Sequence, residues 1–483
     1  MDDENELIAL RRQKVDAIRA LGAAPFGNAF ETTGNIAEVR AKFAEGTTLR
    51  AAGRVTAHRD MGKSHFADIR DASGRLQVYL NSKELTAEAM QLFALVDLGD
   101  FIGVEGECFT TKTGEQTLKV RAFQILAKSL RPLPEKWHGL QDVETRYRQR
   151  YLDLVTNEQS RDTFAKRIAI VREIRTFLQE RGFAEVETPM LQAVAGGAAA
   201  EPFRTHHNAL GLDLYLRIAP ELYLKRLLVG GFDKVFELNR NFRNEGISRR
   251  HNPEFTMLEA YWAYANFEKM ADLVEEMICH LAQTVAGALK IEHRDADGNV
   301  ARTINLERPW RRARYRDLIR DVAGNDWFEL SSEERRAKAK ELGVEVSPQL
   351  ADFEVTQHVF EKLVEEKTFD PLFVTHCPKE LVPLARQNAD DDSLVDVYEL
   401  IINGQEISPG YTELNDPTVQ RQRLIDQAGE ETQSLDEDFL LALEHGMPPA
   451  GGIGVGIDRL TMMLTGAESI RDVILFPLLR PKR

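Results

Sequence analysis

The chain has 483 residues, a hydrophobic content of 43% and a net charge of −15, a composition typical of globular proteins and a length sufficient for two or three domains. No apolar run approaches the about 20 residues of a membrane span, and the start lacks an apolar signal-peptide centre. We therefore expect a cytoplasmic protein with no membrane partner. Cys108, Cys279 and Cys377 are widely spaced without a CxxC pair, which argues against a disulfide framework or a zinc site.

The acid excess lies in residues 151–483, whereas residues 1–150 are nearly balanced. Any affinity for RNA should therefore be confined to local patches and depend strongly on salt. Residues 4–22 have helical apolar periodicity that ends at Gly22, so we expect one amphipathic helix within an N-terminal extension, residues 1–48. Its basic residues are interpreted as a solvated face, with RNA contact as the alternative: Arg11, Arg12, Lys14 and Arg19.

Residues 49–130 contain five short strand-like runs, with turns at 71–74 and 112–114 and a helical stretch at 85–93. Five strands with a helix between the third and fourth indicate an OB-fold barrel, a common platform for single-stranded nucleic acid. On its open face, Phe66 could stack on a base and Gln77 could read a base edge. The alternative is that Phe66 is a core residue of the barrel.

Residues 131–150, which include two prolines in RPLPEKWHG, are interpreted as a linker. A third region, residues 151–483, begins with helical periodicity over 162–180, ended by Gly182. The segment AEVETPML then predicts a strand that stops at Pro189.

The segment FELNRNFRNEGISRRHNPEFTMLEAYWAY, residues 236–264, predicts an antiparallel hairpin, since two alternating runs flank a polar loop. The Arg243 guanidinium could bind a phosphate oxygen bidentately. Glu245 could accept from an exocyclic amine, and Phe255 offers a flat face for stacking. These features favour a nucleotide site over a surface hairpin with solvated arginines.

Two further patterns lie towards the C-terminus. In GGIGVGIDRL, residues 451–460, glycines permit close backbone approach, and Arg459 lies just inside the start of a helix. Glu399 and Glu406, in YELIINGQE, could face one another across a hairpin at Asn403–Gly404. Paired carboxylates near a triphosphate favour Mg²⁺, although they could also be solvated strand residues.

FRNE followed by RHNPEF closely resembles motif 2 of class II aminoacyl-tRNA synthetases, and the likeness to the lysyl-tRNA synthetase branch extends from HRDMGK near residue 58 to RDVILFPLLRPK. The resemblance implies an α+β protein: an N-terminal OB-fold anticodon-binding domain and a class II catalytic domain with an antiparallel sheet flanked by helices. Residues 162–189 match motif 1, which implies a homodimer, and residues 451–460 match motif 3.

The resemblance implies an enzyme that activates L-lysine with ATP and transfers it to tRNA(Lys). The arginines take the catalytic role by binding phosphates, Arg243 the α-phosphate and Arg459 the γ-phosphate. The expected ATP-binding residues are Arg243, Glu245, His251, Asn252, Phe255 and Arg459. The expected lysine-binding residues are Gly197, Glu221, Glu259, Tyr261, Tyr411 and Glu413. The family uses Glu399 and Glu406 for Mg²⁺, and Arg59, Phe66 and Gln77 would contact the anticodon.

Three positions depart from the family pattern. Pro409 stands where many lysyl synthetases have an asparagine expected to contact the lysine carboxylate, and Ser408 could substitute for it. Glu201 replaces a usual basic residue, a change that Arg204 could balance, and Val382 replaces a common serine.

Three other functions stay open from the sequence: a ligase that attaches lysine or β-lysine to a protein, as the elongation factor P ligase does; a class II synthetase for aspartate or asparagine; and a non-catalytic RNA-binding protein. The OB-like region argues against the first, the glutamates of the pocket against the second, and the intact ATP residues against the third.

Overall fold

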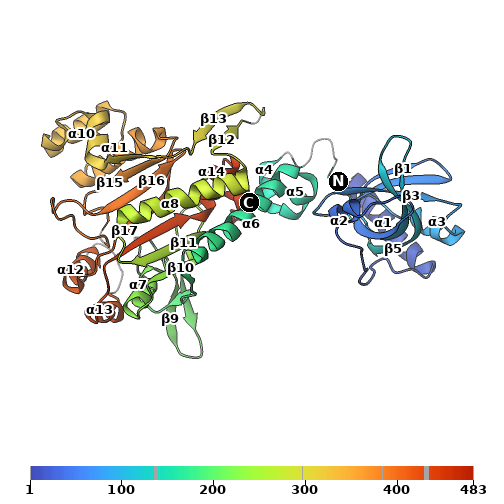
Figure 1. Ribbon diagram of the computed structural model, residues 1–483, viewed down its shortest axis with the longest axis horizontal. Coiled ribbons are helices and arrows are strands. Elements are labelled where there is room, and N and C mark those ends of the chain that lie inside the picture. Colours follow the sequence, from blue (N-terminus) through green and yellow to red (C-terminus); the bar gives the residue numbers. More distant parts are fainter. Residues whose placement is uncertain are drawn as a thin grey trace. The chain divides into compact units, whose positions relative to one another are not determined.

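The computed structural model describes residues 2–134, 140, 142–198, 200–295, 297–382, 384–428 and 435–481. The chain forms two compact units, residues 1–139 and 140–483 (Figure 1). Residues 135–139 and 141 of the expected linker lie outside the described residues, while α4 (Val143–Arg148) falls within the range assigned to that linker.

The first unit is a closed barrel of five strands in the order β1-β2-β3-β5-β4, which confirms the OB-fold prediction. Its strands are β1 (Thr48–Asp60), β2 (Ser64–Arg70), β3 (Arg75–Asn81), β4 (Phe101–Thr110) and β5 (Gln116–Ala127), and its helices are α1 (Asp2–Ala20), α2 (Ile36–Ala41) and α3 (Ala87–Phe93). Alternate apolar residues fill the barrel, because side chains of a strand point to opposite faces in turn. Ile69, Leu76 and Val78 are fully buried there.

Two of the four basic residues of α1 bind the barrel. The guanidinium of Arg11 donates to the carbonyl oxygens of Leu98, Ser129 and Arg131. The Nζ atom of Lys14 lies 2.6 Å from Asp97. The interpretation of these two side chains as a solvated or RNA-contacting face is therefore wrong, because backbone carbonyls bind Arg11 and the Asp97 carboxylate binds Lys14. Arg12 and Arg19 remain exposed.

The second unit is built on a sheet that has eight strands among the described residues, in the order β14-β15-β16-β17-β18-β11-β10-β6. The strands are β14 (Arg311–Arg314), β15 (Leu372–Thr375), β16 (Val397–Ile402), β17 (Gln405–Thr412), β18 (Ala450–Gly456), β11 (Glu254–Ala263), β10 (Lys234–Phe242) and β6 (Ala184–Glu185). Pairing is antiparallel except at the two edges, where β14 with β15 and β10 with β6 are parallel. The α+β fold with a mainly antiparallel sheet is thus confirmed.

Helices cover one face of this sheet. The long helices are α6 (Glu158–Glu180) and α8 (Phe267–Leu281), and α8 lies across the strands in Figure 1. Side chains of α8, including Met270 and Val274, share a core with Leu258 and Val455 of the sheet. On the other face lies α7 (Glu221–Val229), whose Leu222 and Leu228 pack near Tyr261.

The remaining elements lie around this sheet. The helices are α5 (Arg150–Thr156), α9 (Tyr315–Ala323), α10 (Ser332–Glu341), α11 (Asp352–Leu363), α12 (Pro417–Ala428), α13 (Glu437–Glu444), α14 (Ile457–Thr465) and α15 (Ile470–Val473), with single turns η1 (Ala282–Ala286), η2 (Trp327–Glu329) and η3 (Glu365–Lys367). Two small sheets contain β7 (Leu191–Gln192), β9 (Leu212–Leu216) and β8 (Arg204–His207), and β12 (Lys290–Arg294) and β13 (Val300–Asn305).

Both hairpins predicted in this unit are present. β10 and β11 pair from Lys234↔Trp262 to Phe242↔Glu254. The turn between β16 and β17 has positive φ at Asn403 (57°) and Gly404 (71°), as a two-residue hairpin requires. The expected strand before Pro189 is much shorter, two residues in β6, where the chain pairs with β10 before turning away.

Candidate active site

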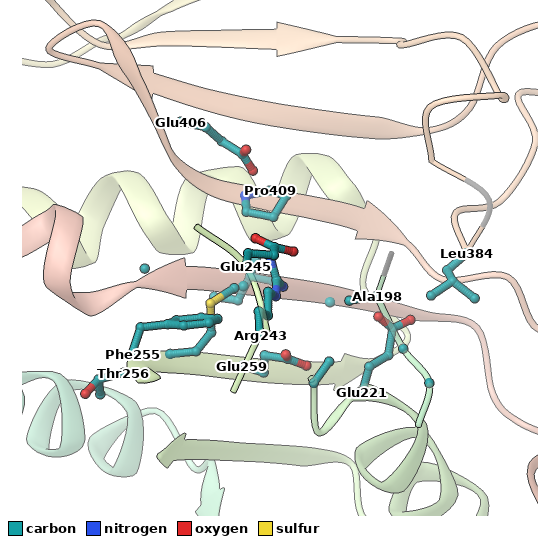
Figure 2. A pocket seen from close by; sticks show the side chains of 18 of the residues that line it. Ala198, Glu221, Arg243, Glu245, Phe255, Thr256, Glu259, Leu384, Glu406 and Pro409 are labelled. Carbon is teal, nitrogen blue, oxygen red and sulfur yellow. The ribbon is translucent and has the colours of Figure 1, made fainter. Parts of the chain in front are cut away.

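A cavity of about 400 Å³ opens on the face of the sheet opposite α8. Its walls come from the loop 195–198, the start of α7, the β10–β11 hairpin, β17, β18 and the start of α14. β11 turns successive residues to opposite faces, so Phe255, Met257, Glu259 and Tyr261 line the cavity while Leu258 and Ala260 enter the core. Figure 2 shows Arg243, Glu259, Glu221 and Glu406 gathered around this space.

One end of the cavity carries Arg243 and Phe255. The guanidinium carbon of Arg243 lies 5.2 Å from the centroid of the Phe255 ring. The buried Nε of Arg243 donates no hydrogen bond to any described residue. The side chain is therefore oriented by the ring and keeps donors for a ligand. Glu245 also lines this end, and its backbone N–H donates to the carbonyl oxygen of Arg243 at 2.9 Å.

Arg459 and His251 hold each other at the same end. The Nη1 atom of Arg459 donates to the Glu406 carbonyl oxygen at 3.0 Å, and Nη2 lies 3.1 Å from His251 Nε2. Burial and the neighbouring Arg459 lower the pKa of His251. Because a guanidinium only donates, Nε2 of the neutral ring accepts, and Nδ1–H is placed to donate to Ser248 Oγ at 2.9 Å.

Asp458, which the sequence analysis did not single out, connects three elements, α14, β11 and α6. Its Oδ2 accepts from the Thr256 backbone N–H at 2.8 Å, and its Oδ1 lies 2.6 Å from Arg167 of α6. Asp458 is 2% exposed. It therefore fixes α14, and with it Arg459, against β11 and α6.

Asn252 is held by its own hairpin. Its Nδ2 donates to the Glu254 carbonyl oxygen at 2.6 Å, while its Oδ1 has no hydrogen-bond partner among the described residues.

The other end of the cavity is anionic. Glu221 begins α7, where the helix dipole favours a carboxylate. The carboxylate of the buried Glu413 lies just behind the cavity lining, because a Cβ on the cavity-lining Gly452 would be only 1.9 Å from Glu413 Oε1. Burial raises the pKa of Glu413, and Lys225 opposes this rise.

Lys225, also missed by the sequence analysis, is fully buried between these two carboxylates. Its Nζ lies 2.6 Å from Glu221 Oε1 and 2.5 Å from Glu413 Oε2. Burial alone would lower the pKa of Lys225, but the two carboxylates raise it above the ordinary value. The lysine is therefore charged.

A third carboxylate, Glu259, lies in β11 on the same face. It is 6% exposed, and its Oε2 accepts from Tyr261 Oη at 3.1 Å. Burial, helped by the negative charge of Glu221, raises the pKa of Glu259 to about 8. Its cross-strand partner Glu237 is already paired with Arg217 at 2.6 Å, so that arginine does not hold Glu259 directly.

Tyr411 and Gly197 complete the expected amino acid pocket. Tyr411 lines the cavity, and burial raises the pKa of its hydroxyl. Gly197 adopts a φ of +87°, and a Cβ there would lie 3.3 Å from the Cβ atoms of Ala219 and Glu221. Glycine therefore allows the loop to pass close to Glu221.

The expected metal pair is brought onto one face of the sheet, though not directly opposite. Glu399 pairs with Pro409 and Glu406 with Ile401, because a bulge at this point adds one residue to β17. Burial and repulsion from Glu406 and Glu365 raise the pKa of Glu399. Glu365 in η3 accepts from the Glu406 backbone N–H at 3.2 Å, and burial raises its pKa to about 7.

Two carboxylates with hard oxygen donors and mutual repulsion fit Mg²⁺, which is often held by one or two carboxylates together with substrate phosphates. Within the described ranges, no group of three or more His, Cys, Asp or Glu side chains is arranged to hold a metal ion.

The departures from the family pattern lie in or near the same cavity. Pro409 and Val382 line it, whereas Ser408 is fully buried outside the lining and hydrogen-bonds the Pro409 carbonyl oxygen. The suggestion that Ser408 replaces the missing side chain therefore has no structural support. Glu201 is exposed and accepts from the Asn244 backbone N–H at 2.8 Å through its own carbonyl.

The predicted nucleic-acid residues lie on the outer surface of the barrel. Arg59 pairs with Phe66 across β1 and β2, and Phe66 pairs with Tyr79 of β3. Because Ala67 and Ile69 fill the core, the interpretation of Phe66 as a core residue is excluded. The Phe66 and Tyr79 rings are 4.8 Å apart.

Gln77 lies on that surface but is only 6% exposed, and its Oε1 accepts from Thr117 Oγ1 at 3.0 Å. Tyr79 is the residue that sequence reasoning missed. The alternation of buried Leu76, Val78 and Leu80 could have identified it.

None of the described residues forms a helix long and apolar enough to cross a membrane. Residues 142–480 match the model of the class II tRNA synthetases (D, K and N), and residues 49–133 match the OB-fold nucleic acid binding domain. The chain is 51% identical to a lysine–tRNA ligase of Carboxydothermus hydrogenoformans over 99% of both chains. It is 50% identical to one of Pelotomaculum thermopropionicum, covering 100% of this chain and 96% of the relative. It is 45% identical to one of Staphylococcus epidermidis over 100% of both.

Proposed function

Because the chain belongs to the class II tRNA synthetases (D, K and N), we propose how its residues divide the work of a lysine–tRNA ligase. The enzyme joins L-lysine to tRNA in two steps. The lysine carboxylate attacks the α-phosphorus of ATP, and the bond to pyrophosphate breaks. A terminal hydroxyl of the tRNA then attacks the carbonyl carbon of the lysyl-adenylate, and AMP leaves. Neither step needs a nucleophile from the protein.

Arg243 binds the α-phosphate and Arg459 the γ-phosphate, each stabilising charge that develops during transfer. Phe255 stacks on the adenine, and Glu245 accepts from its amine. Support comes from Arg243, which is oriented by Phe255 and has donors free, and from His251, which accepts from Arg459. A neutral His251 leaves the positive charge of Arg459 available to phosphate. His251 and Asn252 thereby help to hold the triphosphate.

Glu399 and Glu406 would hold Mg²⁺, which when bound neutralises phosphate charge. The residues themselves supply two oxygen donors on one face of the sheet, with Glu406 at the cavity wall.

The lysine lies at the anionic end, with its ammonium group near Glu413 and Tyr261 and its α-amino group near Glu221. The observation that carries this assignment is the burial of carboxylates at one end of the cavity. A buried carboxylate is unfavourable without a cation, and Glu413 Oε1 accepts no hydrogen bond from any described residue. Glu259, Tyr411 and Gly197 complete the pocket.

The test is ATP–pyrophosphate exchange with each of the twenty amino acids. We expect exchange with lysine alone, and Glu413→Gln should lower kcat/KM for lysine by about 10²-fold, since one partner of a charge pair is lost. The KM for ATP should stay within about threefold. Exchange driven by another amino acid and not by lysine would overturn the assignment.

The barrel binds the tRNA anticodon through Phe66, Arg59 and Gln77. Stacking of a base on an aromatic ring contributes about 1–3 kcal/mol, so Phe66→Ala should weaken aminoacylation by about 10- to 100-fold. Lysine-dependent exchange, which needs no tRNA, should be unchanged. Phe26→Leu, at an exposed phenylalanine of the same unit, is the control. Equal loss of both activities in Phe66→Ala would contradict the assignment.

We also propose a homodimer formed through α6, a helix that exposes 67% of Ile168. Sedimentation equilibrium would test it: the wild type should be a dimer, and Ile168→Glu should shift towards monomer.

We place the enzyme in the cytoplasm, since Cys108, Cys279 and Cys377 are free and its substrates are tRNA and ATP.

A further inference from the structure

Lys225 occupies an unusual place for a lysine side chain. It lies one helical turn after Glu221 in α7, and its side chain has no solvent exposure. Its Nζ is within 2.6 Å of Glu221 Oε1 and 2.5 Å of Glu413 Oε2. An ammonium group without water needs such partners. Lys225 therefore joins two carboxylates that come from separate elements, α7 and β17.

The ammonium of Lys225 lies behind the ligand space and not in it. Glu221 lines the cavity, whereas Lys225 and Glu413 do not, and the Glu413 carboxylate lies beside the cavity-lining Gly452. The two oxygens of Glu413 are used differently. Oε2 contacts Lys225, and Oε1 lies above Gly452 and accepts no hydrogen bond from any residue in the described ranges. One oxygen is thus fixed from behind while the other is left for a ligand.

We propose that Lys225 is a positioning residue that determines how the enzyme recognises the substrate side chain: it fixes Glu413 through Oε2 and Glu221 through Oε1, and so presents Glu413 Oε1 to the substrate ammonium. The inference rests on the proposed placement of lysine at this end of the cavity. It adds a residue that does not touch the substrate but acts through two that do.

The charges of the pocket agree with this role. Glu221 and Glu413 share the Lys225 ammonium group, so this cluster has one carboxyl group more than it has cations. A lysine substrate supplies a further ammonium group at this end, whereas norleucine, which has no side-chain charge, does not.

Loss of Lys225 would leave Glu221 and Glu413 facing each other without a cation. Burial already raises the pKa of Glu413, and Lys225 limits that rise. Other charged or titratable groups act on this cluster from the packed elements: Glu259, Tyr261 and Arg243 of the β10–β11 hairpin, Tyr411 and Glu406 of β17, Glu399 of β16, and Arg217 before α7. Among the described residues, neither Arg243 nor Arg217 contacts Glu413. Without Lys225, the Glu413 carboxylate would therefore bind a proton.

The test compares Lys225→Met with the wild type in lysine-dependent ATP–pyrophosphate exchange between about pH 6 and pH 9. A carboxylate must be ionised to bind an ammonium, so the variant should have a KM for lysine about 10- to 100-fold higher at pH 7. The ratio of variant to wild-type KM should fall as pH rises. The KM for ATP should stay within about twofold. Lys290→Met, at an exposed ion pair with Glu307 (3.5 Å), is the matched control and should behave as wild type.

A double-mutant cycle separates positioning from general damage to the fold. In the Glu413→Gln background, Lys225→Met should raise the KM for lysine by a smaller factor than in the wild-type background, because Glu413 is already neutral and only the ion pair with Glu221 is lost. Norleucine should compete with lysine only weakly in the wild type and more strongly in Lys225→Met. Additive effects of the two substitutions, or a lysine KM ratio independent of pH, would overturn the role of Lys225. If Glu413→Gln alone left the lysine KM unchanged, the proposed pocket itself would be wrong.

Discussion

The two ends of the cavity solve opposite electrostatic problems. At the end that we propose binds phosphate, called the phosphate end, Arg243 and Arg459 are partly accessible. They are held by groups without negative charge: an aromatic ring, a backbone carbonyl and a neutral histidine. At the end that we propose binds lysine, called the amino acid end, Glu221, Glu259 and Glu413 are buried, and Lys225 is buried with them. A triphosphate carries several negative charges, so it can bind arginines that no protein carboxylate neutralises. A single ammonium group carries one positive charge, so the carboxylates that bind it need partial neutralisation by a cation of the protein.

This contrast predicts the largest effect at the phosphate end. Arg459→Ala should lower kcat for lysine-dependent exchange by about 10²- to 10³-fold, the range observed when one group that stabilises transferring charge is removed. The KM for lysine should change little. Arg294→Ala, an exposed arginine of β12, is the control. A large rise in the lysine KM with unchanged kcat would show that the two ends are not independent.

A smaller effect is expected from narrowing the amino acid end. In Gly452→Ala the new Cβ would lie 1.9 Å from Glu413 Oε1 and 2.7 Å from Tyr261 Cε1, so the carboxylate must move. The KM for lysine should rise about 10²-fold with the KM for ATP nearly unchanged. Gly454→Ala lies two residues along the same face, where the Cβ would meet the flexible end of Met257 at 2.7 Å. Its effect should be less than about tenfold. Equal losses in both variants would refute the contact.

The two ends also differ in how far the sequence predicted them. At the phosphate end, neighbouring residues in the sequence form the site, so the alternation around Arg243 and Phe255 predicted the hairpin that the structure has. The nucleotide as its ligand stays a prediction. Asp458 was missed because its partners, Arg167 and Thr256, are distant in sequence. In the barrel, the sequence pattern predicted the strands but left open whether Phe66 lies on the outside or in the core.

At the amino acid end, sequence reasoning found the carboxylates through family resemblance and missed Lys225. A lysine in an amphipathic helix is ordinarily solvated, and only the tertiary structure shows Glu413 of β17 beside it. The bulge in β17 was equally invisible, since it is the extra residue before Ser408 that moves Glu406 and Pro409 onto one face. A local sequence pattern does not show which charged side chains from distant elements neutralise one another in the fold.

The smallest expected effect concerns stability, at Glu259. Its pKa is about 8 in the folded chain and near its ordinary 4.5 when unfolded, so the folded state retains a proton that the unfolded state has lost between these values. Stability should therefore fall as pH rises through this window. Glu259→Gln removes the effect.

Without lysine, the Glu259→Gln variant should melt a few degrees above the wild type at about pH 8.5, at about 2–4 °C per kcal/mol recovered. At about pH 4.5 the two should melt together. Saturating lysine favours the ionised Glu259, so it should stabilise the wild type more than the variant and reduce the difference at pH 8.5. Thermal unfolding of the wild type and the variant at both pH values, with and without lysine, measures these differences in melting temperature. If the variant melted below the wild type at pH 8.5 without lysine, the negative charge of Glu259 would already be compensated within the protein.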